Sequence, residues 1–377
     1  MAAGHPTQVL IVDDSAVMRS LLRSAVTAAP GFEVVGTAAD GASALNAIES
    51  LHPGLVLLDV EMPVMDGLVT LKKLRMRGHR MPVIMCSALT RRGAKVTIEA
   101  LATGASDYVT KPAGQSSREA AIQALTQDLI PKIHALTSNP RPRPQPAFPG
   151  VFRSTPIFPF TPLPMAHAVS PIPLVVAIGA STGGPAALDV LLPALPESLP
   201  LSVLIVQHMP EMFTRLFADR LNGRCRLPVR EAAEGDPVRP GMVYIAKGNW
   251  HMEVLAAARI SSPPTLHLSQ GAPENHCRPA VDVLFRSMAA VYGAGVLAVV
   301  LTGMGSDGMM GCRAIRDRGG SVLAQDQASS AVWGMPGAVT NAGLAQKVLP
   351  LHAIAWEITR LVRRPPAETV ALREMVV

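Results

Sequence analysis

Five polar side chains follow four apolar runs in the first third of the chain: Asp13, Asp14, Asp59, Ser87 and Lys111. Three carboxylates brought together would repel one another unless a hard cation neutralised them, and Mg²⁺ with oxygen ligands fits that need. A carboxylate beside Mg²⁺, with a lysine and a hydroxyl group to hold a phosphoryl group, is a phosphoryl acceptor. We expect Asp59 to be that acceptor. A single aspartate here could equally be a helix cap or a turn residue, but that does not explain all five positions.

A turn of small residues, Gly179-Ala-Ser-Thr-Gly-Gly184, follows an apolar run in the second half of the chain. Its glycines permit a tight turn with close backbone approach, and Pro185 suits the first position of a helix. Such a turn can expose Ser181 as a nucleophile, with the amide of Thr182 aimed into the same space. Glycine-rich turns at this position also cradle nucleotide phosphates, so the motif alone leaves both interpretations open.

The next strand favours serine chemistry over nucleotide binding. The turn lacks the Gly-x-Gly-x-x-Gly spacing of a dinucleotide site, and the following apolar run ends in Gln207-His208 instead of an acidic residue. His208 at that place could act as a general base for Ser181. His251 and His276 are the alternative histidines, and a single histidine in such a domain is more often structural.

A third loop, Leu301-Thr-Gly-Met-Gly-Ser-Asp-Gly308, also follows an apolar run. It offers Asp307 as the carboxylate that orients the imidazole, and its glycines leave the amide near Met304 free to donate. Asp307 by itself could be only a helix cap. The chain order Ser, His, Asp differs from that of the α/β-hydrolases, so their fold is not implied.

Apolar runs alternate with amphipathic stretches on both sides of a proline-rich middle segment. In the first part the predicted strands are Val9–Val12, Glu33–Gly36, Leu55–Leu58, Val83–Cys86 and Tyr108–Val109. Five such βα units predict a parallel sheet with helices on both faces, a flavodoxin-like (βα)₅ fold. Open sheets of this kind bind ligands beyond the carboxyl ends of their strands, where the five polar residues fall.

The second part repeats the alternation. The predicted strands are Leu174–Ile178, Val203–Val206, Val296–Leu301 and Ser321–Ala324, and the predicted helices begin at Pro185 or span Met212–Leu221 and Met309–Arg316. This pattern predicts a second doubly wound, mainly parallel α/β domain. The segment Met252–Leu268 is predicted to be a small inserted hairpin.

Prolines recur every few residues from Asn139 to Pro173, which prevents a persistent helix or central strand. We therefore predict a first domain over residues 1–133, a Pro-rich linker over 134–173 and a second domain over 174–377. The linker's phenylalanines could pack on a neighbouring domain, although an ordinary solvated spacer is favoured; they are Phe148, Phe152, Phe158 and Phe160.

The amino-acid composition disfavours several classes of function. The net charge of +6 is not gathered into a dense Lys/Arg cluster in either domain, and only 4% of residues are aromatic, which disfavours nucleic-acid binding. No apolar run approaches the length of a membrane span, and the first residues lack a signal-peptide pattern, so we expect a cytoplasmic protein. The cysteines lack paired spacing and are expected to be reduced thiols; they are Cys86, Cys225, Cys277 and Cys312.

Residues 8–133 resemble the receiver domain of two-component response regulators. The matching text is Val12-Asp-Asp-Ser15, Leu58-Asp-Val-Glu-Met-Pro-Val-Met-Asp-Gly67, Ser87-Ala88 and Tyr108-Val-Thr-Lys-Pro112. The resemblance implies Mg²⁺ bound by Asp13 or Asp14, by Asp59 and by the backbone carbonyl of Glu61. It also implies a Ser87/Tyr108 switch pair, with Lys111 nearby, that reorients when a histidine kinase phosphorylates Asp59.

Residues 175–361 resemble the catalytic domain of chemotaxis protein-glutamate methylesterases. The matching text is Ile178-Gly-Ala-Ser-Thr-Gly-Gly-Pro185, Val206-Gln-His-Met-Pro210, His276-Cys-Arg-Pro279, Val281-Asp-Val-Leu-Phe285, Leu301–Gly308 and Gly334-Met-Pro-Gly337. Ala280 departs from the small hydroxyl residue common there, and the linker is unusually long. The order of receiver, linker and catalytic domain matches the whole family.

The resemblance implies hydrolysis of glutamate methyl esters on chemoreceptors, with deamidation of certain receptor glutamines. Ser181 would be the nucleophile, His208 the general base and Asp307 its orienting carboxylate, with the amides of Thr182 and Met304 as the oxyanion hole. No cofactor is expected for hydrolysis, and the protein would work beside membrane receptor arrays without inserting. The alternatives are a response regulator whose second domain binds a nucleotide or a partner without catalysis, and a scaffolding role.

Overall fold

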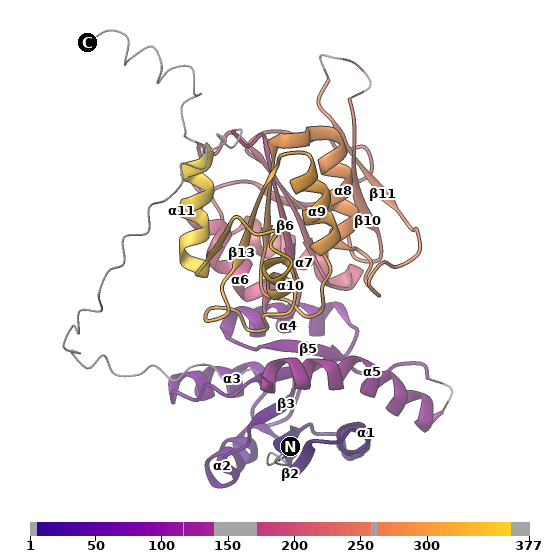
Figure 1. The fold of residues 1–377 in the computed structure, drawn as a ribbon. Coiled ribbons are helices and arrows are strands. Elements are labelled where there is room, and N and C mark those ends of the chain that lie inside the picture. The colour runs from indigo at the N-terminus through magenta and orange to yellow at the C-terminus, as the bar shows by residue number, and fades with distance from the viewer. Residues whose placement is uncertain (1–5, 116, 139–171, 258, 260–261, 363–377) are drawn as a thin grey trace, which may run out of the picture.

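The computed structural model describes residues 6–115, 117–138, 172–257, 259 and 262–362. They form two parallel sheets, each with helices on both faces, as the alternation of apolar runs and helical patterns predicts (Figure 1). We call residues 6–138 the first domain and residues 172–362 the second domain. The linker phenylalanines lie outside the described residues, so the packing considered for them stays open.

The first domain has a five-stranded sheet in the order β2-β1-β3-β4-β5, with every pairing parallel. Its elements are β1 Thr7–Val12, α1 Ala16–Thr27, β2 Phe32–Ala38, α2 Gly41–Leu51, β3 Leu55–Asp59, α3 Gly67–Met76, β4 Val83–Ser87, α4 Arg91–Thr103, β5 Asp107–Thr110 and α5 Arg118–Thr137. The strands β3 and β4 are buried along their whole length, as expected of a sheet covered on both faces. Each of the five helices begins with an N-cap side chain that accepts a hydrogen bond from an amide of the first turn; these residues are Ser15, Asp40, Asp66, Thr90 and Ser117.

The second domain has a seven-stranded sheet in the order β14-β13-β12-β6-β7-β9-β8. Its strands are β6 Val175–Ala180, β7 Ser202–Gln207, β8 Val229–Glu231, β9 Val243–Ile245, β12 Val296–Val300, β13 Ser321–Gln325 and β14 Lys347–Leu349. The predicted insertion is confirmed as an antiparallel hairpin of β10 His251–Leu255 and β11 Thr265–Ser269.

Helices cover both faces of this second sheet. The helices are α6 Gly184–Leu191, α7 Glu211–Asn222, α8 Val281–Tyr292, α9 Met309–Asp317, α10 Met335–Asn341 and α11 Leu351–Val362. Buried residues of α6, α7 and α11 share one apolar cluster, and those of α8, α9 and α10 share another. The doubly wound fold expected from the sequence is therefore confirmed.

The two domains meet through α4, β5 and α5 of the first domain, which lie against the second domain in Figure 1. The Tyr108 ring stacks on Phe213 of α7, with ring centroids 4.7 Å apart and planes inclined by 17°. Val332 joins the apolar cluster that contains α1, α5 and one face of the first sheet, and Met304 packs against it. Apolar side chains of both domains thus take part in the contact.

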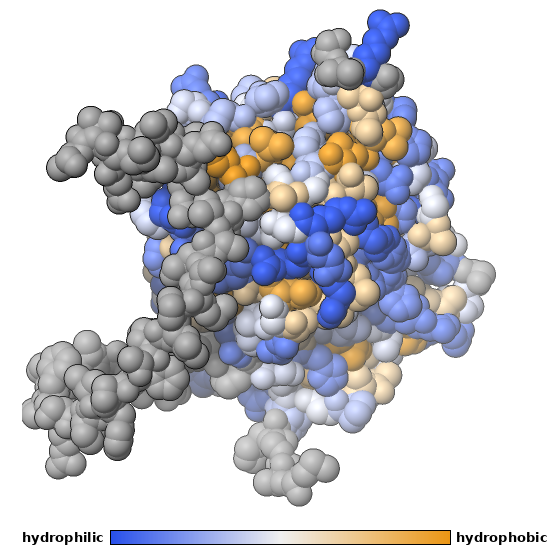
Figure 2. All heavy atoms as spheres, turned by 45° about the horizontal axis from the view of Figure 1, so that its top comes forward, coloured by the Kyte–Doolittle hydropathy of each residue, from blue (hydrophilic) through white to orange (hydrophobic). Residues whose placement is uncertain are grey.

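The opposite end of the second domain faces the viewer in Figure 2. Hydrophilic and hydrophobic residues are interspersed there, and no large continuous hydrophobic area stands out among the coloured atoms. No helix within the described residues is long and apolar enough to cross a membrane.

A buried ion pair ties α11 to the sheet edge. The side chain of Glu357 is only 3% exposed, and its carboxylate lies 2.8 Å from Lys347 Nζ of β14 and 2.7 Å from Arg360 Nη2. The hydrogen bond from Arg360, followed by those from Lys347, outweighs burial and lowers the pKa of Glu357 to about 2. Since the folded pKa is depressed, this stabilisation is present above the ordinary pKa of the carboxyl group and is lost as pH falls toward 2.

We predict that Glu357→Gln lowers the free energy of unfolding at pH 7 by about 1–2 kcal/mol, discounted because both cations are partly exposed. The difference in the free energy of unfolding between the variant and wild type should shrink as pH falls from 5 to 3. All three tryptophans, Trp250, Trp333 and Trp356, lie in the second domain, so urea unfolding followed by tryptophan fluorescence reports on that domain. Glu211→Gln, which breaks a more exposed pair with Lys247, is the control and should cost under about 0.5 kcal/mol. A deficit that is equal at pH 7 and pH 3 would contradict the assignment.

Candidate functional site

The carboxylates predicted at the edge of the first sheet do come together. Asp13, Asp14 and Asp59 each offer an oxygen within 4.8 Å of the others; Asp13 and Asp59 are buried and Asp14 is exposed. Lys111 Nζ lies 2.8 Å from Asp13 Oδ2 and 2.7 Å from Asp59 Oδ1. The parallel strands β1, β3 and β5 place these residues together because their carboxyl ends share one edge.

One ammonium group faces three carboxylates at this edge, so negative charge is left uncompensated. Burial first and the charge of Asp13 second raise the pKa of Asp59 to about 6, against the lowering effect of Lys111. An all-oxygen donor set with excess negative charge suits a hard cation such as Mg²⁺. Asp13, Asp14 and Asp59 would hold the ion; the part expected of the Glu61 carbonyl stays a prediction.

The expected switch residues, Ser87 and Tyr108, lie on the neighbouring strands β4 and β5. Ser87 is buried at the end of β4, where its hydroxyl donates to the carbonyl of Ala88 at 3.2 Å. Tyr108 points toward the second domain and is stacked on Phe213. Lys132 of α5 donates to the Tyr108 carbonyl at 2.8 Å, and its ammonium group lies 5.3 Å from the centre of the tyrosine ring. The ring is therefore held at the interface between the domains.

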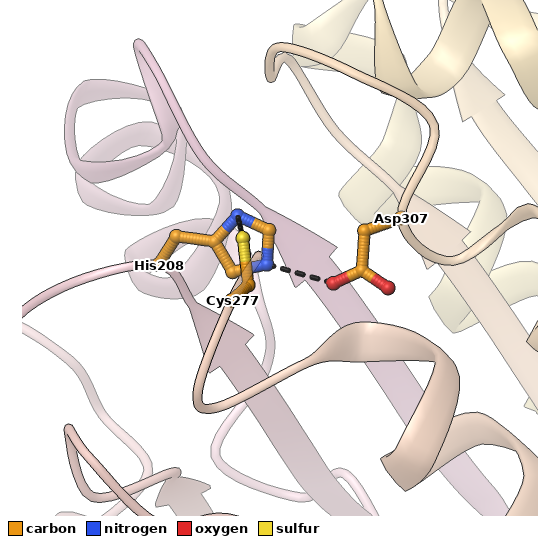
Figure 3. A group of neighbouring side chains, drawn as sticks. All are labelled: His208, Cys277 and Asp307. Atoms are coloured by element: carbon orange, nitrogen blue, oxygen red, sulfur yellow. Dashed lines mark hydrogen bonds and ion pairs between the residues drawn. The ribbon is translucent and has the colours of Figure 1, made fainter. Parts of the chain in front are cut away.

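The histidine and the carboxylate singled out in the second domain are in contact. His208 follows β7 and Asp307 follows β12, and His208 Nε2 lies 2.8 Å from Asp307 Oδ2 (Figure 3). The other ring nitrogen, Nδ1, lies 3.5 Å from Cys277 Sγ. Burial disfavours the imidazolium, but the hydrogen bonds to Asp307 and Cys277 outweigh burial and raise the pKa of His208. The pairing with Asp307 fixes the orientation of the imidazole ring, as a general base requires.

Asp307 is held by donors from several segments. Its carboxylate accepts from the amides of Val281 at 2.6 Å and Asp282 at 3.0 Å, from its neighbour Gly308 at 3.0 Å and from Asn275 Nδ2 at 2.9 Å. Burial raises its pKa, but the hydrogen bonds from His208 and these amides prevail, so the pKa of Asp307 lies below its ordinary value. The carboxylate is therefore ionised and fixed in orientation.

The turn that carries Ser181 lies against the loop of Asp307. Gly183 has a φ of 78°, which a glycine adopts without strain, and the Ser181 amide donates to the Thr302 carbonyl at 3.1 Å. A Cβ added to Gly303 would lie only 2.9 Å from Ser181 Cβ, so this glycine permits the close approach. Among the described residues the Ser181 hydroxyl has no hydrogen-bond partner, and Cys277 Sγ lies over the imidazole ring, 3.5 Å from Nδ1 (Figure 3).

The two amides expected to form an oxyanion hole are those of Thr182 and Met304. Neither amide donates to an acceptor within the described part of the chain. Both residues contact the first domain: the Thr182 hydroxyl donates to Asp107 Oδ2 at 2.6 Å, and Met304 packs against the cluster that contains α5. The first domain therefore covers the residues beside Ser181.

The alternative histidines do not join this cluster. His251 is buried, its Nε2 lies 3.0 Å from the carbonyl of Ala272, and its Nδ1 accepts from the amide of Ala280 at 3.2 Å. These contacts give His251 a structural role. His276 is exposed, with a φ of 62°.

Sequence reasoning missed two residues of the site. Asn275 bridges the carboxylates of Asp282 and Asp307, and Cys277 contacts His208. Both come from the loop before α8, in which we expected an alternative histidine at His276 and only a reduced thiol at Cys277. The nearest signal was the cluster of polar residues between the hairpin and the next apolar run.

Comparisons with known proteins identify a family for each of the two halves of the chain. A family model described as response regulator receiver domain matches residues 9–123, and one described as CheB methylesterase matches residues 176–358. The catalytic domain of the CheB methylesterase from Thermotoga maritima has a solved structure that is 40% identical; the match covers 50% of this chain and 99% of that one, with a TM-score of 0.49.

Two curated relatives match nearly from end to end, and both are named protein-glutamate methylesterase/protein-glutamine glutaminase. The relative from a Nocardioides species is 49% identical, covering 96% of this chain and 97% of its own. That from Trichodesmium erythraeum is 46% identical, covering 94% and 98%. With a receiver domain followed by a methylesterase domain, and with this identity over almost its whole length, the chain belongs to the protein-glutamate methylesterase/protein-glutamine glutaminase family.

Proposed function

We propose that this chain hydrolyses glutamate methyl esters on chemoreceptors, releasing methanol, and deamidates certain receptor glutamines. The observation that carries the proposal is the His208–Asp307 pair beside the turn of Ser181, with two free amides next to it. The names of the relatives supply the substrate class. The nucleotide-binding and scaffolding alternatives leave this grouping unexplained.

Ser181 acts as the nucleophile. His208 Nδ1 takes the hydroxyl proton while Ser181 Oγ bonds to the ester carbonyl carbon, and the amides of Thr182 and Met304 stabilise the oxyanion. The imidazolium then gives its proton to the leaving methoxide oxygen, which departs as methanol. Water, deprotonated by His208, attacks the acyl-enzyme, and the proton returns to Ser181 Oγ as the glutamate leaves. With a glutamine substrate the leaving group is ammonia.

Asp307 holds the imidazole through Nε2, which leaves Nδ1 for the proton transfers. For catalysis the Nδ1 atom must reach the Ser181 hydroxyl. Hydrogen bonds of this kind are often completed only in the substrate complex. No step of this hydrolysis calls for a metal or organic cofactor.

In this proposal the receiver domain regulates the esterase in response to phosphorylation. Receiver domains are phosphorylated on an aspartate, typically with Mg²⁺; we assign Asp59 as the acceptor, a histidine kinase as the source of the phosphoryl group, and Asp13, Asp14 and Asp59 as Mg²⁺ ligands. When bound, the ion would screen the carboxylates and the incoming phosphoryl group, while Lys111 pairs with the phosphoryl oxygens. We place the protein in the cytoplasm beside membrane receptor arrays, with no role for nucleic acid.

The contact between the domains offers a route from Asp59 to Ser181. Asp107 binds Thr182 and Tyr108 packs on Phe213, and we propose that in the unphosphorylated chain these contacts hinder access of substrate to the oxyanion hole. Phosphorylation that reorients Ser87 and Tyr108 would weaken this contact. Changing the ratio of open to closed chains from 1:99 to 99:1 requires a free-energy change of about 5.5 kcal/mol. The loss of one hydrogen bond, one ring stack and the surrounding apolar contacts can together supply a change of this size.

We predict that Ser181→Ala lowers methanol release from methylated receptor by at least about 10³-fold, since a triad acts as a unit. A fluorophosphonate should label wild type at Ser181 and leave the variant unlabelled. Ser269→Ala, a change of the same kind in β11, is the control and should keep both activities. Full esterase activity in Ser181→Ala, or nucleotide binding by a chain that resists the label, would refute the assignment.

We predict that Asp107→Ala raises methanol release without a phosphodonor. Loss of the buried bond to Thr182, worth about 1.5–3 kcal/mol, would increase the open population about tenfold or more. Asp40→Ala is the matched control, because Asp40 caps α2 far from the second domain and its loss should leave the unphosphorylated rate unchanged. An unchanged rate in Asp107→Ala would contradict the proposal that the first domain inhibits the esterase by covering the residues beside Ser181.

A further inference from the structure

The side chain of Gln207 links the backbone of the proposed nucleophile to that of the proposed general base. Gln207 is the last residue of β7 and is only 2% exposed. Its Nε2 donates to the carbonyl of Ser181 at 3.0 Å and to the carbonyl of its neighbour His208 at 3.3 Å. Strands β6 and β7 pair with Ala180 opposite Gln207, so the chain leaves the sheet at adjacent points in these two segments. One side chain therefore holds both segments where they leave the sheet.

The oxygen of the same amide group lacks a partner. Gln207 Oε1 is buried and accepts no hydrogen bond within the described part of the chain, which costs free energy. The reversed orientation of the amide group would be worse, because Oε1 would then face two carbonyl oxygens. An apolar side chain of similar length would leave no polar atom unpaired here. The two donated hydrogen bonds are therefore what distinguishes glutamine from such a side chain at this position.

The carbonyl of Ser181 belongs to the same peptide group as the amide of Thr182. This peptide group is planar and trans, so its oxygen and its N–H point in opposite directions. The oxygen accepts from the Gly184 amide at 2.7 Å and from Gln207 Nε2. These two bonds fix the direction of the Thr182 N–H, which is one of the two amides of the proposed oxyanion hole.

The second amide of the proposed oxyanion hole is held in the same way. The Met304 amide shares a peptide group with the carbonyl of Gly303, which accepts from the amides of Gly334 at 3.0 Å and Met335 at 2.8 Å. Each oxyanion-hole amide thus has two donors on the carbonyl at the opposite end of its peptide group. Among these donors only that of Gln207 comes from a side chain. It can therefore be removed by substitution while the backbone donors stay.

We propose that Gln207 is a positioning residue that aims the Thr182 amide at the oxyanion formed during hydrolysis. The inference rests on the proposed function and adds the residue that fixes one half of its oxyanion hole. A hydrogen bond to a peptide carbonyl also polarises the peptide group, which makes its N–H a stronger donor. Gly184 is part of the arrangement, because a Cβ at that position would overlap Gln207 Oε1.

The oxyanion develops in the transition state and is absent from the bound ester. Loss of an interaction made only in the transition state lowers kcat, whereas the ground-state binding reflected in KM is kept. Removal of the two donated bonds of Gln207 should therefore reduce kcat selectively. A side chain that only supported the fold would show no such preference for kcat.

The first test is methanol release from methylated receptor by the full chain, with the same phosphodonor and Mg²⁺ in every assay. Gln207→Met keeps the length of the side chain and removes both donated bonds, so kcat should fall at least about tenfold while KM changes less than about twofold. Gln346→Met is the matched control. Gln346 precedes β14 and accepts from the Val322 amide near the start of β13, toward the opposite edge of the sheet from Ser181. This control should keep both constants.

The second test uses Gln207→Glu, which has the same shape and a titratable donor. A protonated carboxyl group can donate its O–H to the Ser181 carbonyl, whereas a carboxylate donates nothing and repels that oxygen. Burial raises the pKa of a carboxyl group, so its ionisation falls in the range of the assay. The kcat of Gln207→Glu divided by that of Gln207→Met should therefore fall at least about threefold as pH rises from about 5.5 to about 9. The ratio removes the titration of His208, which both variants share.

Urea unfolding followed by tryptophan fluorescence shows which variants are folded at each assay pH. Should Gln207→Met not fold, the ratio of Gln207→Glu to wild type gives the same pH test. Wild-type kcat in folded Gln207→Met, or a ratio that does not change with pH, overturns the positioning role. A wild-type chain that releases no methanol and resists the fluorophosphonate contradicts the proposed function instead.

Discussion

The buried carboxylate of Asp307 is the group around which the second domain's site is built. An ionised carboxylate removed from water is costly unless hydrogen bonds replace its hydration. Here the replacements come from separate segments: His208 after β7, the first amides of α8, and Asn275 from the loop before it. Since each segment must be in place to satisfy the carboxylate, one charge fixes the geometry of all of them.

Asp307 contacts both the start of a helix and the imidazole of His208. Its oxygens accept from Val281 and Asp282, the first residues of α8, so the side chain stabilises the start of that helix from another segment. The same carboxylate binds His208. Helix capping and orientation of the imidazole are thus one structural feature, and changes near the start of α8 are expected to affect both.

Much of this architecture could be predicted because the central strands are fully buried and therefore appear in the sequence as continuous apolar runs. The strands β8, β9 and β14 were missed, since three residues carry too little pattern. The polar residues at the strand ends were predictable because a parallel sheet brings its carboxyl ends to one edge. The contacts of Asn275 and Cys277 were not, because they depend on the path of a loop in which Asn275 and His276 both have positive φ.

The central claim is that phosphorylation of Asp59 uncovers a serine esterase that the receiver otherwise covers. The most direct measurement is the rate of methanol release from methylated receptor by the full chain, with and without a small-molecule phosphodonor and Mg²⁺, in wild type and in Asp59→Asn. We expect a large increase in wild type and none in Asp59→Asn. Equal rates with and without phosphodonor in wild type, under conditions in which Asp59 is shown to be phosphorylated, would contradict it.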